Sequence, residues 1–344
     1  MKGKTNSSFT MCTLGIETTC DEMAAAVVED GIHIRSNVIA SQSDFHKKFG
    51  GVYPEMAARQ HVDLLIPTIQ EALEQAEVTA EEIDLIAVAK GPGLIGPLMI
   101  GLNAAKTLAL AWGKPFLGVN HVEAHLYAAM MSNEKFVFPG LGVVVSGGHT
   151  FLVRILDVGE YEMIGTTVDD AIGEAFDKVA TLLDLPYPGG PEVEALAKQG
   201  DPMKYPFKAG RVKGRPWDFS FSGLKTNVLY TVKGQNGDKR GKTAIVDEEK
   251  PHVAASFQEA ALGDVVNKAL AAAKEFDCKA IYVGGGVSNN RRLREMLICD
   301  FPVYFPGKGL SLDNAAMIAG LGTRLYKGKS DPFDLEPKTR IHLN

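Results

Sequence analysis

The sequence predicts an α/β protein made of two similar lobes that hold a nucleotide-like ligand between them. First, an apolar strand enters a small polar turn and returns as a second strand at residues 13–31, and again at residues 142–159. Second, strands and helices alternate after each hairpin, which is the pattern of an α/β lobe. Third, both turns carry Gly and hydroxyl-bearing residues, which allow backbone N–H groups to approach a phosphate. Two ordinary hairpins are the alternative interpretation.

Length and composition agree with a two-part globular protein. The chain has 344 residues, so two domains or one duplicated pair are expected. Its 45% hydrophobic and 23% charged residues are ordinary for a soluble globular enzyme. We predict an N-terminal lobe over residues 1–135 and a C-terminal lobe over residues 136–344, the latter with a basic insertion around residues 200–245.

The lack of a recognisable targeting signal and the cysteine content predict the cellular compartment. No apolar run reaches the roughly 18 residues of a membrane span, and no signal-peptide core follows the charged N-terminus. The four cysteines include no C-x-x-C pair, which argues against a zinc knuckle and against a disulfide framework. We therefore expect a cytoplasmic protein with no membrane partner.

Hydrophobic periodicity and turn residues define the elements of the N-terminal lobe. Pro54 stands near the start of a helix, where its missing N–H is harmless. A Gly-rich loop at residues 91–97 joins a buried strand to a helix N-terminus, a junction suited to anions. The expected elements are hairpin strands within 9–41, a helix over 54–76, a strand over 83–89, a helix over 98–112, a strand over 115–119 and a helix over 121–131.

The C-terminal lobe repeats the pattern with longer helices. Gly189, Gly190 and Pro191 are expected to break the chain before a short helix, and residues 311–314 to cap the last helix. The expected elements after the second hairpin are a strand over 161–168, helices over 171–183 and 249–276, a strand over 280–283, a helix that carries Arg291, and a last helix ending near 326.

A pair of histidines gives the sharpest local signal. If residues 121–131 are helical, His121 and His125 project from one face and can share a metal ion. Glu123 stands between them and points away from that face, unlike the Glu of a His-Glu-x-x-His protease. Asp313, at a helix start, is the best-placed third ligand, and the set suits Fe²⁺ or Zn²⁺ as a Lewis acid. A coincidental histidine pair is the alternative.

Other polar groups mark a binding site in the second half. His149 is either a ligand contact or an ordinary turn residue after Ser146. Asp170, Glu174 and Asp177 can share a helix face, where like charges would repel unless a cation or a hydroxyl-rich ligand lay before them. The alternative for Asp169 and Asp170 is that they cap the N-terminus of the helix. Gly284–Gly286 would let a flat ring approach the backbone, with Asn290 available for hydrogen bonds; a tight turn is the alternative.

Basic residues are concentrated in two places although the net charge is −6, which argues against generic nucleic-acid binding. In residues 202–217, five cations alternate with aromatic side chains and no acid occurs: Lys204, Lys208, Arg211, Lys213 and Arg215 with Tyr205, Phe207 and Trp217. A second group holds Lys233, Lys239, Arg240 and Lys242. Such interleaving suits a surface that contacts nucleic-acid backbone and bases; a solvated loop is the alternative.

Taken together, these motifs resemble the TsaD family, the tRNA adenosine threonylcarbamoyltransferases. The resemblance covers nearly all of residues 13–326, and it implies the duplicated actin/hexokinase/Hsp70-like fold. The segments that carry it are Gly15–Glu22, Gly50–Glu55, Gly91–Gly96, His121–His125, Ser146–Thr150, Asp169–Lys178, Phe219–Thr226, Gly285–Arg291 and Asp313–Ala319.

The resemblance implies a reaction and a metal. The threonylcarbamoyl group would pass from threonylcarbamoyl-AMP to the N6 amine of the adenosine beside the anticodon, in tRNAs that read codons beginning with A. His121, His125 and Asp313 would hold one divalent metal, usually assigned as Fe²⁺, with Zn²⁺ or Mg²⁺ as alternatives. The implied partners are tRNA, a TsaB-like paralogous subunit and a TsaE-like P-loop ATPase.

The resemblance also implies substrate contacts. Asp21 and Glu22 match acids near the reacting end, and we hypothesise that one of them accepts the amine proton as a catalytic base. The positions that match the family's substrate contacts are Val144, Val145, Ser146, Gly147, Gly148, Asp177, Gly190, Glu194 and Asn290.

Three other functions remain open from the sequence. A metalloprotease shares the histidine pair, but the position of Glu123 argues against it. A sugar-kinase-like phosphotransferase shares the fold, but gives the histidine pair and the acidic cluster no role. A non-catalytic scaffold could use both lobes to bind partners.

Overall fold

Two five-stranded sheets share one strand topology, as the paired hairpins predict. The computed structural model describes residues 10–42, 53–131, 133, 136–234, 245–341 and 343. The first sheet has the order β3-β2-β1-β4-β5, in which β1, β2 and β3 are antiparallel neighbours and β4 and β5 continue parallel to β1. Its strands are β1 (Cys12–Glu17), β2 (Glu22–Glu29), β3 (His33–Ser41), β4 (Leu85–Gly91) and β5 (Phe116–Asn120).

The second sheet repeats this arrangement, because its order β8-β7-β6-β9-β10 again joins an antiparallel meander to two parallel strands. The repeat confirms the duplicated α/β fold class. Its strands are β6 (Gly140–Val145), β7 (Thr150–Asp157), β8 (Glu160–Thr166), β9 (Ala280–Gly284) and β10 (Val303–Tyr304).

The described chain forms two compact units. Unit 1 contains the described residues up to 42, then 53–127 and 313–341, and unit 2 contains most of residues 128–312. The last helix, α10 (Ala315–Leu325), therefore packs with unit 1. The lobe boundary at 135/136 stays a prediction about the duplicated halves of the chain.

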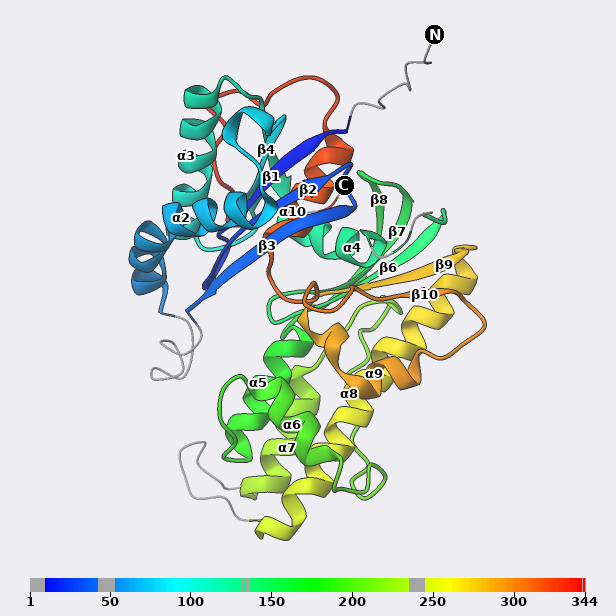
Figure 1. The fold of residues 1–344 in the computed structure, drawn as a ribbon. Coiled ribbons are helices and arrows are strands. Elements are labelled where there is room, and N and C mark those ends of the chain that lie inside the picture. The colour runs from blue at the N-terminus through cyan, green and yellow to red at the C-terminus, as the bar shows by residue number, and fades with distance from the viewer. Residues whose placement is uncertain are drawn as a thin grey trace. The chain divides into compact units, whose positions relative to one another are not determined.

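Helices cover both faces of the sheet in unit 1 (Figure 1). Because successive strand residues point to opposite faces, Leu14 and Ile16 join a core under α2 and α3, while Gly15 lies against α10. The helices of this unit are α2 (Pro54–Ala76), α3 (Ile95–Trp112), α10 and the first part of α4 (His121–Met131), with the 3₁₀ helix η1 (Ala80–Glu82).

Helix α3 is the one helix among the described residues that is long and apolar enough to raise the question of a membrane span. Its 18 residues have a mean hydropathy of 1.2, so length and composition alone would permit a membrane span. Its buried face packs on β4 and α2, and a core helix of a globular unit has the same composition. The expected absence of a membrane partner stays a prediction.

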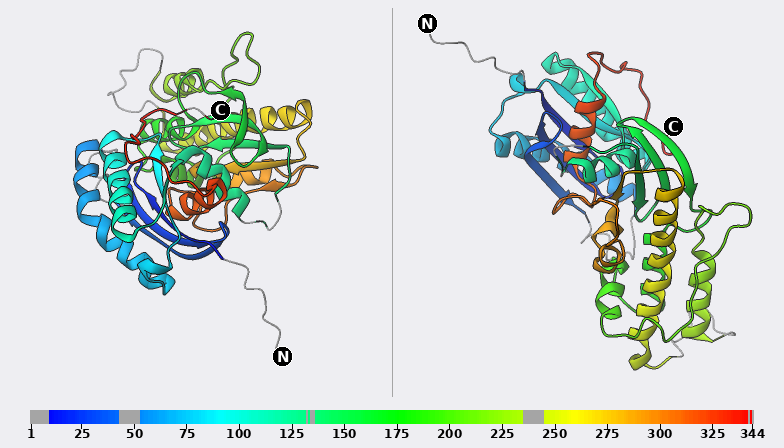
Figure 2. Two further views of the ribbon diagram at one scale, coloured as in Figure 1. Left: turned by 90° about the horizontal axis from the view of Figure 1, so that it is seen from above. Right: turned by 90° about the vertical axis from the view of Figure 1, so that its right-hand side faces the viewer.

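In unit 2, the sequence between β8 and β9 adds a layer of helices. In this layer the long helix α8 packs against α5, α6 and α7 (Figure 2). Helix α7 and strand β10 are not predicted from the sequence pattern. The helices are α5 (Ile172–Leu182), α6 (Gly189–Ala197), α7 (Ser222–Lys233), α8 (Lys250–Glu275) and α9 (Arg291–Met296), with the 3₁₀ helices η2 (Asp247–Glu249) and η3 (Gly286–Asn289).

Two helix starts differ from the sequence-based expectation. Gly189 and Gly190 do not break the chain but form the first turn of α6, after the N-cap residue Pro188. The last helix is capped by the side chain of Asn314, which accepts a hydrogen bond from the Met317 N–H at 3.0 Å, so Ser311 lies outside the cap.

Candidate active site

Two helix starts bring the predicted metal ligands together in unit 1. Strand β5 runs directly into α4, and the Asn120 side chain accepts the Val122 N–H at 2.9 Å, so His121 becomes the first residue of the helix. His125 follows one turn later on the same face. Asp313 immediately precedes Asn314, the N-cap of α10.

The three side chains fit one metal ion. Asp313 Oδ1 lies 3.2 Å from His125 Nε2 and 3.6 Å from His121 Nε2, and the three ligand atoms lie within 4.8 Å of one another. Two atoms bound to one metal at about 2.1 Å are roughly 3 to 3.5 Å apart. Two imidazoles and a carboxylate form a donor set that suits Fe²⁺ or Zn²⁺. The group is therefore a candidate metal site.

Glu17, which the sequence analysis did not select, fixes the orientation of His121. It ends β1 with a fully buried side chain, and its Oε2 lies 2.9 Å from His121 Nδ1. Its other oxygen accepts the Thr19 N–H at 2.6 Å, which ties it to the first polar turn. A carboxylate on Nδ1 leaves Nε2 for the metal and sets the tautomer of the ring. Only its place in the first turn could have suggested this role.

The same carboxylates control the charge of His121. Burial alone would lower the pKa of its imidazole, but Glu17 and Asp313 more than offset that effect and raise it to about 9. In the metal-free protein the ring is therefore held in its protonated form, between two acids. A metal ion would replace that proton as the positive charge between them.

Glu22 lies at the other end of the first turn, as the first residue of β2. Ser41 donates a hydrogen bond to its Oε1 at 2.9 Å, while Oε2 is buried without a hydrogen-bond partner among the described residues. Burial first, and then Asp21 and Asp313, raise the pKa of Glu22 to about 7. A carboxyl group with this pKa can both take up and release a proton near neutral pH.

Five of the predicted substrate positions line one pocket in unit 2, with a volume of about 290 Å³. They are Gly147, Asp177, Gly190, Glu194 and Asn290. Phe176, Val287 and Leu312 supply apolar surface to the same pocket. An apolar lining with a few polar groups is typical of a small-ligand site, and this volume is close to the lower limit of roughly 300 Å³.

Asp177 and Asn290 already serve the framework of the pocket. Asp177 accepts the Gly189 N–H at 2.8 Å and so holds the start of α6, and burial raises its pKa. Asn290 caps α9 through the Leu293 N–H at 3.1 Å and donates to Gln258 Oε1 at 2.9 Å. Its amide therefore keeps at most one N–H for a ligand.

The second polar turn follows β6 beside this pocket. Val144 and Val145 are buried in the strand, so only their backbone could meet a ligand. Ser146 closes the turn through its N–H to the His149 carbonyl at 2.9 Å, and leaves Gly147 and Gly148 exposed. Gly285, at φ 92°, passes so close that a Cβ there would lie 2.6 Å from the Val145 carbonyl oxygen. Only glycine fits this approach.

The acidic cluster has its positive partners within the protein. Asp170 binds Lys178 at 2.7 Å and Lys225 at 2.5 Å, and Glu174 binds Lys178 at 2.7 Å. Asp169 accepts hydrogen bonds from Ser220, Ser222 and the Phe221 N–H at the start of α7. Capping and ion pairing thus account for Asp169, Asp170 and Glu174, and Asp177 is the member that lines the pocket.

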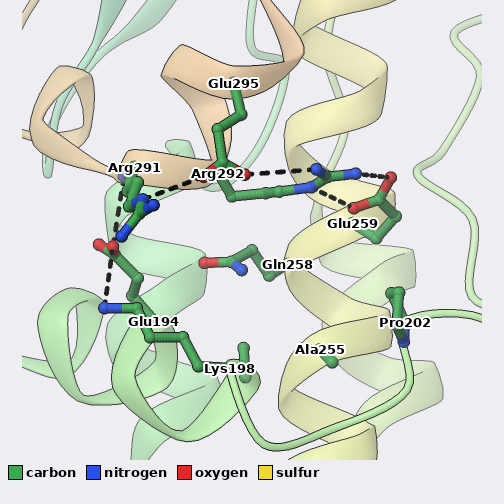
Figure 3. A pocket seen from close by; sticks show the side chains of 10 residues that line it. Glu194, Lys198, Pro202, Ala255, Gln258, Glu259, Arg291, Arg292 and Glu295 are labelled. Carbon is green, nitrogen blue, oxygen red and sulfur yellow. Dashed lines mark hydrogen bonds and ion pairs between the residues drawn. The ribbon is translucent and has the colours of Figure 1, made fainter.

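Glu194 also borders a second pocket of about 230 Å³ in unit 2. There it accepts the Arg291 N–H at 3.3 Å and faces Lys198 at 3.8 Å. Figure 3 shows Gln258 projecting between this group and the Arg292–Glu259 ion pair. The Glu194 carboxylate is therefore partly engaged away from the pocket that contains Asp177.

The fold and these groups define an α/β protein of the actin/hexokinase/Hsp70-like class with a candidate metal site. Among solved structures, the HypF of T. kodakarensis matches with a TM-score of 0.61 at 14% identity, over 91% of this chain and 48% of that one. The ROK hexokinase of Thermus thermophilus matches with a TM-score of 0.51 at 16% identity, over 91% and 97%. These similarities establish the fold alone.

Sequence comparison gives the family. The TsaD family model, described as tRNA N6-adenosine threonylcarbamoyltransferase, matches residues 33–320. A protein of that name from Protochlamydia amoebophila is 60% identical over 97% of this chain and 98% of its own length. Another, from Chlamydia felis, is 48% identical over 96% of each chain. The chain belongs to the TsaD family and is a transferase.

Proposed function

We propose that the protein transfers the threonylcarbamoyl group from threonylcarbamoyl-AMP to N6 of the adenosine beside the anticodon, in tRNAs that read codons beginning with A. The observation that carries the proposal is the convergence of His121, His125 and Asp313 in a chain whose close relatives carry the name of this activity. Metalloprotease, kinase and scaffold functions have no comparable support.

The adenylate part of the donor is assigned to the pocket that contains Asp177 and Gly190. The apolar side chains of Phe176, Val287 and Leu312 suit a purine ring. Ribose hydroxyls can donate hydrogen bonds to the Asp177 carboxylate, and the exposed glycines of the second turn leave their backbone N–H groups accessible to a phosphate. Val144, Val145, Ser146 and Gly148 would act through the backbone or shape of that turn, and Glu194 and Asn290 would complete the wall.

The metal is assigned to His121, His125 and Asp313, with Fe²⁺ as the first choice and Zn²⁺ or Mg²⁺ as alternatives. A divalent cation there would act as a Lewis acid toward the phosphate or the carbonyl group of the donor. Glu17 holds His121 in the orientation that this role requires.

The chain's own residues must orient the reactants and move one proton. The exocyclic amine of adenine is a weak nucleophile because its lone pair is delocalised into the ring, whereas the mixed anhydride of the donor has a good leaving group. The protein therefore has to hold both reactants together and exclude water. Glu22 is the better candidate for the base that accepts the amine proton, because its pKa lies near 7; Asp21 is the alternative.

The proposed partners and location follow the family resemblance. A TsaB-like paralogous subunit and a TsaE-like P-loop ATPase would assist turnover. The sparse cysteines, with no C-x-x-C pair, agree with a reducing cytoplasm and no disulfide framework.

Mass spectrometry of tRNA nucleosides tests this function. Purified chain, threonylcarbamoyl-AMP and an unmodified tRNA transcript should yield N6-threonylcarbamoyladenosine, with the partner subunits added if a single turnover is too slow to detect. The His121→Ala variant should yield far less product under the same conditions. If wild-type chain with all partners produces no modified nucleoside, the proposed function is wrong.

A further inference from the structure

The basic segment of residues 202–217 connects α6 to α7 and is anchored to α8 at its start. The Tyr205 N–H donates to Ser256 Oγ at 3.1 Å, and the Tyr205 hydroxyl donates to Glu249 Oε2 at 2.6 Å. The Asp201 N–H donates to His252 at 2.9 Å. At the other end, Phe219 pairs with Thr167, next to the end of β8. The segment thus has fixed ends.

The aromatic side chains of the segment point inward. Tyr205, Phe207 and Trp217 pack against the hydrophobic core of unit 2, and the rings of Tyr205 and Phe207 stack with centroids 5.6 Å apart. Trp217 meets the Phe276 ring edge-on at 5.8 Å. The rings therefore anchor the segment, so stacking on nucleic-acid bases is not their role here, and the cations form its outer surface.

All five cations of the segment are exposed, and three of them form no ion pair with a described residue. Lys204 is paired with Glu249 at 2.6 Å, and Arg215 is paired with Asp218. Lys208, Arg211 and Lys213 are exposed and form no ion pair with any described residue. Asp264 interacts electrostatically with Arg211, but its carboxylate is already bound by Lys268 at 2.7 Å. Lys239, Arg240 and Lys242 of the second basic group lie outside the described residues.

Hydrogen bonds connect this surface to the framework of the pocket in unit 2. The Gly210 N–H donates to the Ser220 carbonyl at 2.9 Å, and Ser220 Oγ donates to Asp169 at 2.6 Å. Asp169 precedes α5, where the Gly173 N–H donates to the Ser146 carbonyl at 3.1 Å. The segment that carries the three cations is thus linked through Asp169 to α5, the helix that packs on the second polar turn.

We propose that Lys208, Arg211 and Lys213 bind the phosphate backbone of the tRNA substrate; this inference rests on the proposed function. A chain with net charge −6 needs a local cationic surface to hold a polyanion, and residues 202–217 supply one without a single acid. Because the aromatic rings are turned inward, we expect the three cations to contact tRNA phosphates and not to recognise the base sequence. An acidic protein surface is the competing occupant.

The salt dependence of tRNA binding tests the proposal. The dissociation constant of an unmodified tRNA transcript is measured by fluorescence anisotropy over a series of NaCl concentrations, for the full-length chain and for the triple variant Lys208→Ala, Arg211→Ala, Lys213→Ala. A matched control, Lys308→Ala, Lys327→Ala, Lys329→Ala, removes three other exposed cations. The slope of log K against log salt should fall in magnitude by roughly 2 to 3 in the first variant, about one per lost phosphate contact, and stay unchanged in the control.

The outcomes separate this inference from the proposed function. AMP affinity and melting temperature should match those of the wild type in both variants. If the wild type modifies tRNA but the triple variant keeps the wild-type slope, the surface assignment is wrong and the function stands. An unchanged slope with lost binding of a partner subunit would assign the segment to a protein partner instead. If the wild type neither binds nor modifies tRNA, both proposals fail.

Discussion

At the scale of single residues, two glutamates of the first polar turn differ because of what surrounds them. Glu17 is completely buried but pairs with His121 and with the Thr19 N–H, so its charge is compensated. Glu22 is half-buried, and its buried Oε2 lacks a hydrogen-bond partner among the described residues, so its protonated form is favoured. The first arrangement orients a ligand, and the second prepares a proton acceptor.

Replacing Glu17 by Gln should lower the affinity for the metal ion more than it lowers the stability of the fold. The amide keeps the shape of the side chain but loses the charge that makes His121 a strong ligand, so metal affinity should fall about 10- to 100-fold. Competition with a fluorescent chelator measures this affinity directly. Glu29→Gln, which changes an acid of β2 paired with Arg35, is the control and should leave it unchanged. Equal affinities for wild type and Glu17→Gln would show that Glu17 has no positioning role.

Replacing Glu22 by Gln should change the pH dependence of stability. The folded pKa of about 7 lies above the ordinary value of 4.5, so the wild type loses stability as pH rises from about 4.5 through 7. Thermal unfolding of chelator-treated protein should therefore show little effect of Glu22→Gln at pH 4.5 and a stabilisation on the order of 2 kcal/mol at pH 8, discounted because the group is partly exposed. Single-turnover transfer should be slow in the same variant. A variant that unfolds like the wild type at both pH values would contradict the environment described for Glu22.

At the scale of elements, the site depends on what stands at strand ends and helix starts. The His121 helix and the Asp313 helix follow β5 and β10, the last strands of the two repeated sheets, so the duplication places ligands at equivalent positions of the chain. Close packing of α5 on the second polar turn shapes the pocket in unit 2. A Cβ at Gly173 would lie 2.7 Å from the Ser146 carbonyl oxygen.

Gly173→Ala and Gly223→Ala form a matched pair, because each glycine is the second residue of its helix. The first substitution should displace the Ser146 turn, weaken AMP binding at least about tenfold and destabilise the fold by roughly 1 to 3 kcal/mol. The second has open space around it and should be neutral or stabilising by up to about 1 kcal/mol. Calorimetric titration with AMP and thermal unfolding measure both effects. Similar AMP affinities in the two variants would remove the turn from the binding site.

Long periodic elements could be predicted closely, whereas short ones and distant contacts could not. The helix from Pro54 to Ala76 and the helix from His121 to Met131 have the predicted bounds, because apolar spacing and cap residues define them locally. The two-residue strand β10 is too short to show a periodic pattern in the sequence. The start of α7 is stabilised by Asp169, which lies far away in sequence and accepts the Phe221 N–H. The pairing of Glu17 with His121 spans 104 positions and leaves no local pattern.

At the scale of the whole molecule, the repeated sheet topology confirms the duplicated fold that the two hairpins predicted. One unit holds the His–His–Asp group, and the other holds the pocket of Asp177 and Gly190. In the proposed reaction the metal ion serves catalysis, and the pocket binds the adenylate part of the donor. Removal of the metal ion should therefore abolish transfer without changing the affinity for AMP, since none of the residues that line the pocket is a proposed metal ligand.

Titration of the metal-free chain in a single-turnover transfer assay shows whether a metal ion at His121, His125 and Asp313 is required for catalysis. Chelator-treated protein, mixed with threonylcarbamoyl-AMP and tRNA, receives increasing amounts of Fe²⁺, and parallel series use Zn²⁺ and Mg²⁺. We expect the transfer rate to rise until one equivalent of the active metal per chain is present and then to level off. His121→Ala should show no such rise. Full activity of the metal-free protein, or of His121→Ala, would contradict this expectation.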